Sequence, residues 1–387
     1  MRSILLLGIM TSAVLFGAET PLPDLLKSQN GEKVSTPEQW KNRRAELLEI
    51  FRSQVFGRNA VERPEKLSFK VTETDPKALD GKATRKAVTI AYAGAGGEGA
   101  IHLVLFVPNE RTKPAPAFVL LCNRPAENID PTREKKSPFW PAEQIVARGY
   151  AAAAFLVADV DVDKDDGFHD GVHGIFDPKD KPRGPDAWGT IAAWAWGGSR
   201  VMDYFETDGD IDAKRVAVIG HSRGGKTALW CGASDERFAM AISNCSGCTG
   251  AAIARHKKGE HIEKINTSFP HWFCTNYKNY NGKDDELPFD FHMLVALMAP
   301  RPVCIASATL DTWADPDNEF LSCVEASPAW ELFGKKGVVA TKIPAPESPV
   351  EDGMIAYHLR TGKHDLTEYD WKCYMDFADK RMTETKN

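Results

Sequence analysis

Short apolar runs alternate along the chain with segments whose apolar residues recur at a helical period. Residues 150–157 are almost continuously apolar, as expected for a strand covered on both faces. Further strands are predicted at residues 86–92, 101–107, 117–121, 215–219, 238–243, 303–308 and 354–358, and helices at 40–51, 187–205, from 223 onward and 367–380. This alternation predicts an α/β fold with three layers, in which a mostly parallel sheet carries helices on both faces.

The chain shows neither an internal repeat nor a Gly/Ser linker, so residues 19–387 are predicted to form one catalytic domain. Its 48 basic and 54 acidic residues give a formal charge of -6. A mildly acidic surface offers no basic footprint for nucleic acid or an anionic membrane. We therefore expect a monomer that binds no nucleic acid and has no stable membrane partner.

The N-terminus has the layout of a secretory signal peptide. Arg2 precedes an apolar stretch that reaches Phe16 and is short for a membrane span. We assign residues 1–18 to the signal and expect a secreted or periplasmic protein. Because Phe16 stands where a small residue is usual, the cleavage site is left open, as is retention of the segment as an anchor.

A pair of cysteines and an acidic segment each resemble a known type of metal or redox site. Cys245 and Cys248 form a C-x-x-C pair, but no second pair or spaced histidines complete a zinc site, so a structural role or plain buried thiols are expected for the pair. The eight cysteines could also form disulfides in an oxidising compartment, and their pairing is left open. Residues 159–170 resemble a calcium loop. Counted from Asp159, however, the sixth position is Lys164 and the twelfth is Asp170, which favours a solvated loop at the mouth of the sheet.

The most specific motif is a G-x-S-x-G sequence centred on Ser222, at residues 220–224. An apolar strand pattern ends directly before it, and a helical pattern begins directly after it. A serine held on such a turn is the nucleophile elbow of the α/β-hydrolase fold. The N–H of Arg223 is then one expected oxyanion donor, with a second from the loop near Asn123 and Arg124.

A serine nucleophile needs a base and an orienting acid, which follow it in the order Ser, acid, His in this fold. His364 lies in a short loop between the final strand and the final helix, whereas His358 falls within the strand pattern. Asp311 is the first carboxylate after the strand at residues 303–308. The predicted triad is Ser222, Asp311 and His364, with Asp315, Asp317 and Glu319 as alternative acids.

The elbow extends to residues 220–226 (GHSRGGK), and this longer string resembles the bacterial glucuronoyl esterases of carbohydrate esterase family 15. An ordered set of further segments resembles the same family, at residues 193–200, 246–252, 269–273, 287–294 and 313–316. The resemblance runs from about residue 187 to His364, while the N-terminal third fits only loosely.

The resemblance implies a serine esterase that needs no metal or other cofactor. Its substrate would be the ester between 4-O-methyl-glucuronic acid of glucuronoxylan and alcohols of lignin. Ser222 would attack, and His364 would act as base and then as acid. Arg223 would help hold the oxyanion, Lys226 would bind sugar hydroxyls, and Trp313, which core packing could equally explain, would line the sugar pocket.

One departure from the family pattern bears on the acid. Members with the acid after the earlier strand carry Glu where this chain has Cys245, which favours the later position of Asp311. Two alternatives remain beside the glucuronoyl esterase. One is an acetylxylan or other polysaccharide esterase that uses the same triad, and the other is a catalytically silent carbohydrate-binding homologue.

Overall fold

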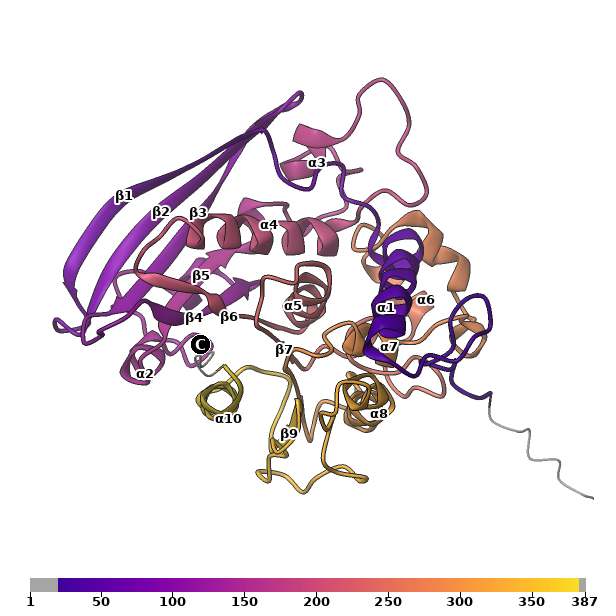
Figure 1. Ribbon diagram of the computed structural model, residues 1–387. Coiled ribbons are helices and arrows are strands. Elements are labelled where there is room, and N and C mark those ends of the chain that lie inside the picture. The colour runs from indigo at the N-terminus through magenta and orange to yellow at the C-terminus, as the bar shows by residue number, and fades with distance from the viewer. Residues whose placement is uncertain (1–19, 383–387) are drawn as a thin grey trace, which may run out of the picture.

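The computed structural model describes residues 20–382, so the predicted signal peptide lies outside the described residues. One nine-stranded sheet runs through the molecule in the order β1-β2-β3-β5-β4-β6-β7-β8-β9 (Figure 1). The strands are β1 Lys66–Ala78, β2 Ala83–Gly94, β3 Gly97–Pro108, β4 Ala115–Cys122, β5 Ala151–Leu156, β6 Ile211–His221, β7 Met240–Asn244, β8 Val303–Ala308 and β9 Ile355–Arg360.

The sheet has a parallel part and an antiparallel part. Strands β5, β4, β6, β7, β8 and β9 are parallel to one another, whereas β1, β2 and β3 form an antiparallel meander whose strand β3 pairs antiparallel with β5. The mostly parallel α/β fold predicted from the sequence is confirmed. Strand β1 was not predicted, because nearly all of its residues are exposed or half-buried and it lacks an apolar run.

Apolar residues on both faces of the sheet pack against helices. Val119 and Leu121 of β4 join the core under one layer, while Phe118 and Leu120 face the core under the other. The first layer contains α1 Pro37–Phe51, α4 Thr190–Phe205, α5 Arg223–Ser234, α7 Phe291–Ala296 and α8 Pro316–Ala326, and the second contains α2 Ala142–Ala147 and α10 Glu368–Arg381 (Figure 1). The described residues also include the short helices α3 Gly171–Phe176, α6 Ile262–Ser268 and α9 Pro328–Glu331.

Helix boundaries follow local capping signals. Thr36 accepts a hydrogen bond from the N–H of Gln39 and is followed by Pro37, so α1 begins three residues before the predicted helix at 40–51. A capping box between Thr367 and Asp370 starts α10, close to the predicted boundary. Among the described residues, no helix is long and apolar enough to span a bilayer.

Candidate active site

Ser222 stands at the turn between β6 and α5. Its backbone has φ 58° and ψ -123°, a strained conformation for a residue other than glycine. The turn is tight enough that a β-carbon at Gly220 would lie 2.0 Å from the carbonyl oxygen of Gly224. The N–H of Ser222 donates to the carbonyl of Asn244 at 2.9 Å, which ties the elbow to β7. The local geometry is that of the predicted nucleophile elbow.

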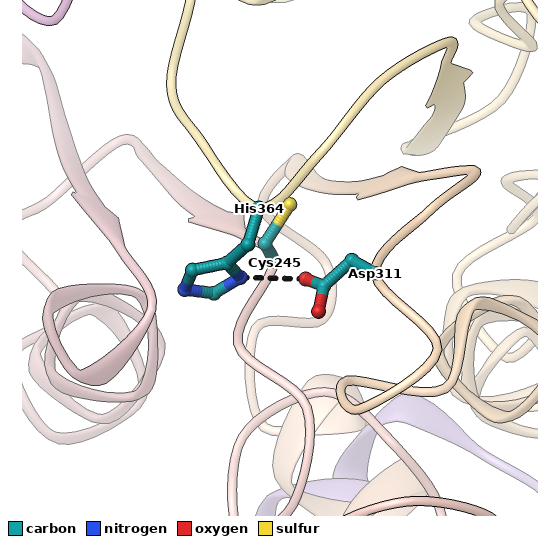
Figure 2. A group of neighbouring side chains, drawn as sticks. All are labelled: Cys245, Asp311 and His364. Carbon is teal, nitrogen blue, oxygen red and sulfur yellow. Dashed lines mark hydrogen bonds and ion pairs between the residues drawn. The ribbon is translucent and has the colours of Figure 1, made fainter.

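His364 and Asp311 come together from the loops that follow β9 and β8. The Nδ1 atom of His364 lies 2.6 Å from Oδ2 of Asp311 (Figure 2). Because a carboxylate only accepts, Nδ1 carries the proton and Nε2 has a free lone pair in the neutral ring. Burial alone would raise the pKa of Asp311, but the hydrogen bond and the charge of His364 outweigh it and lower that pKa.

His221 links this pair to the elbow. Its ring centroid lies 4.4 Å from that of His364, and it directly precedes Ser222. Its Nδ1 lies 2.6 Å from Oδ1 of Asn244, whose amide nitrogen donates to Tyr374. Burial, reinforced by the charge of His364, lowers the pKa of His221 to about 3. His221 is therefore a neutral ring that packs the His364 loop against the end of β6.

The alternative acids and base have other partners. Asp315 caps α8 and accepts from the N–H of Lys258, and Asp317 is an exposed charge 3.4 Å from the ammonium of Lys258. The Nε2 atom of His358 lies 2.9 Å from Asp370, and both side chains are buried. Within residues 20–382, Asp311 is the carboxylate hydrogen-bonded to His364.

Glu319, the third alternative acid, is fully buried beneath the site. It accepts from the N–H of Gly247 at 2.8 Å and from the hydroxyl of Ser307 at 2.6 Å. These bonds fix the loop after β7 to the end of β8. Burial raises the pKa of Glu319 to about 7.

This raised pKa predicts a pH-dependent penalty on stability. Unfolded Glu319 ionises near its ordinary value of 4.5, whereas the folded chain keeps the proton until about pH 7. Stability relative to Glu319→Gln should therefore fall as pH rises through this interval, by on the order of 3 kcal/mol. Urea denaturation of both proteins at several pH values measures the difference. Two stability curves that stay parallel would contradict the prediction.

All eight cysteines are free and buried, in agreement with the expectation of buried thiols. Cys245 lies beside the catalytic candidates, and its Sγ atom is within 4.8 Å of ligand atoms of Asp311 and His364 (Figure 2). Burial raises the pKa of its thiol well above the usual value, so Cys245 is a neutral neighbour of the imidazole rather than a second anion.

Arg223 and Lys226, the two cationic residues that follow Ser222, both interact with other residues of the chain. The Arg223 guanidinium pairs with Asp163 and lies over the ring of Trp272, 4.7 Å from its centroid. Lys226 is 3% exposed, and its ammonium donates to the carbonyls of Ser246 and Cys248 at 2.6 and 2.5 Å. In this structure Lys226 supports the loop after β7, and sugar binding by Lys226 stays a prediction.

Trp313 and the loop after β4 border the site. Trp313 is 51% exposed, so the alternative that it packs in the core is wrong. Asn123 follows β4, and its Oδ1 would lie 3.2 Å from a β-carbon at Gly224, which places Asn123 against the elbow. This oxygen is buried without a hydrogen-bond partner. The second oxyanion donor stays a prediction.

The expectation that residues 159–170 form a solvated loop is wrong for Asp161, whereas Asp163 and Asp165 are exposed as expected. Asp161 is 3% exposed and binds His173 at 3.0 Å and the hydroxyl of Thr190 at 2.7 Å. Asp163 binds residues beside the elbow. Sequence reasoning missed these roles because the partners are distant in the chain.

A mostly parallel sheet with a strained serine at the end of a central strand, and with an Asp–His pair after two later strands, defines an α/β-hydrolase. Comparisons with known proteins narrow the class. The sequence family described as "Glucuronyl esterase, fungi" matches residues 182–334. The curated "Carbohydrate esterase MZ0003" of an unknown prokaryotic organism is 42% identical over 397 residues, which cover 94% of this chain and 90% of that protein.

Two solved structures are similar over nearly the whole chain. A glucuronoyl esterase from Solibacter usitatus has a TM-score of 0.87 at 42% identity and covers 93% of this chain and 97% of its own. A promiscuous CE15 esterase from a marine bacterial metagenome has a TM-score of 0.85 at 41% identity, covering 94% and 98%. The chain belongs to the glucuronoyl esterases of carbohydrate esterase family 15, which are carboxylic ester hydrolases, and the resemblance seen in the sequence is confirmed.

Proposed function

We propose that this protein hydrolyses the ester between 4-O-methyl-glucuronic acid of glucuronoxylan and lignin alcohols, through an acyl-enzyme on Ser222. The observation that carries the proposal is the hydrogen-bonded pair of Asp311 and His364 packed next to the elbow. The names of relatives support 4-O-methyl-glucuronate as the acyl group of the substrate. They include 4-O-methyl-glucuronoyl methylesterase of Hypocrea jecorina, 27% identical over 84% of this chain and 65% of its own length.

In the proposed mechanism, Nε2 of His364 takes the proton of the Ser222 hydroxyl as the oxygen attacks the ester carbonyl. Asp311 holds the imidazole in the required tautomer and stabilises the imidazolium that forms. The N–H of Arg223, at the start of α5, donates to the developing oxyanion. His364 then protonates the leaving alcohol, and water releases the glucuronate by the reverse sequence.

Trp313 is proposed to bind the sugar, because its indole is exposed in the loop that carries Asp311. An aromatic stack contributes about 1 kcal/mol, so Trp313→Ala should raise KM for a methyl glucuronate ester roughly fivefold and leave kcat nearly unchanged. Leu310, 64% exposed in the same loop, gives a matched control as Leu310→Ala. Equal effects of the two variants would assign the indole no part in binding.

The substrate is tested with purified protein on benzyl and methyl glucuronate esters and on acetylated xylan. Turnover of the glucuronate esters with little release of acetate supports the proposal. Release of acetate with little turnover of the glucuronate esters identifies the alternative function, an acetylxylan esterase. Inactivity on every ester together with retained glucuronoxylan binding identifies a silent homologue. Export to the periplasm or medium and a monomeric state are part of the proposal, tested by fractionation and light scattering.

A further inference from the structure

Three distant segments meet at the carboxylate of Asp163. Its Oδ1 accepts from Nε2 of His271 at 3.0 Å and from the indole N–H of Trp272 at 2.7 Å, and its Oδ2 accepts from the guanidinium of Arg223. Asp163 lies in the loop after β5, Arg223 opens α5, and the other two follow α6. One carboxylate thus joins the nucleophile turn to two separate loops.

The donors around Asp163 are rigidly held. His271 and Trp272 are 5% and 3% exposed, and the indole of Trp272 stacks on Phe269 with ring centroids 3.7 Å apart. The Arg223 guanidinium covers this stacked pair, 4.7 Å from the Trp272 ring and 5.2 Å from the Phe269 ring. Arg223 is therefore confined between a carboxylate and an aromatic surface.

The surroundings of Asp163 also stabilise its ionised form. Burial would raise its pKa, but the hydrogen bonds from His271 and Trp272 and the charge of Arg223 outweigh burial and lower the pKa to about 2. The carboxylate stays ionised throughout the pH range in which an esterase works. The Arg223 side chain is 32% exposed, so part of its guanidinium is accessible to a ligand.

We propose that Asp163 is a positioning residue, which fixes the Arg223 side chain beside Ser222 so that its remaining donors meet the uronate part of the ester. A guanidinium has five N–H donors, so pairing with one carboxylate leaves donors for a ligand. Without Asp163 the arginine would lose its fixed orientation. The inference rests on the proposed function for the identity of the uronate.

The test is a double-mutant cycle with Asp163→Asn and Arg223→Ala, measured as kcat/KM on methyl glucuronate ester and on 4-nitrophenyl acetate. The asparagine side chain keeps the shape and one acceptor but removes the charge. The single Asp163 variant should lose on the order of 10²-fold on the glucuronate ester, less on the acetate, and almost nothing further once Arg223 is gone. Asp165→Asn, an exposed carboxylate of the same loop, is the matched control.

A purely structural role would give a different result. Asp163→Asn would then lower activity by the same factor with and without Arg223, and equally on both substrates, which would overturn the proposal. Activity of Asp163→Asn equal to that of the Asp165 control would also overturn it. If the parent hydrolyses no glucuronate ester, the proposed function fails, but the same double-mutant cycle measured on the free energy of unfolding still decides whether Asp163 holds Arg223, and additive effects there would overturn that part.

Discussion

Ser222→Ala is expected to lower kcat by roughly 10⁶-fold, the scale seen when a serine hydrolase loses its nucleophile. The reason is that, in the proposed mechanism, the hydroxyl of Ser222 forms the acyl-enzyme, and alanine has no group that can replace it. KM or the dissociation constant of a glucuronate ester should change little. The rate is measured on methyl glucuronate ester, with mass spectrometry of the parent to detect the acylated serine.

The matched control for this variant is Ser246→Ala, because Ser246 lies in the neighbouring loop after β7 and its hydroxyl contacts Glu319 and the N–H of Ala251. That variant should keep most of its activity. A Ser222→Ala protein as active as the parent would remove Ser222 from the mechanism and with it the proposed acyl-enzyme.

Asp311→Asn should lower kcat by about 10⁴-fold. An amide that donates its N–H to His364 would favour the wrong tautomer, with the proton on the nitrogen that must accept from Ser222. The loss should appear in kcat while substrate affinity is retained. Asp317→Asn, an exposed carboxylate of the following helix, is the control.

The position of Cys245 allows a second test of the role of Asp311 as the acid that orients His364. Its Sγ is within 4.8 Å of ligand atoms of Asp311 and His364, so a carboxylate introduced there is close enough to take over part of the orienting role. Cys245→Asp in the Asp311→Asn background should recover part of the lost rate. Near-normal turnover of Asp311→Asn alone would instead transfer the acid role to another residue.

The sequence predicted those parts of the fold whose signals are local. The strand at 303–308 has the predicted bounds, and the elbow around Ser222 is recognisable because its tight turn brings Gly220 against Gly224, where a side chain would clash. Position in the fold also led to Asp311, since a loop after β8 faces the loop after β9. Such arguments need only the order of elements along the chain.

Contacts between distant segments could not be predicted in this way. The pairing of Asp163 with Arg223 spans 60 positions, and the buried contacts of Glu319 depend on how two loops pack. Polar side chains in a loop resemble solvated charges until their partners are known. Strand β1 escaped prediction for a related reason, because its register is set by pairing with β2 and not by burial.

The outer strand of the meander has a consequence for self-association. An edge strand presents unpaired backbone groups that can recruit another chain. β1 carries lysine, glutamate and aspartate side chains, contains Pro76, and is interrupted by register shifts between Val71 and Glu73 and between Asp75 and Ala78. The register shifts bend this edge of the sheet and the charged side chains repel a second edge, so both features disfavour extension of the sheet by another molecule.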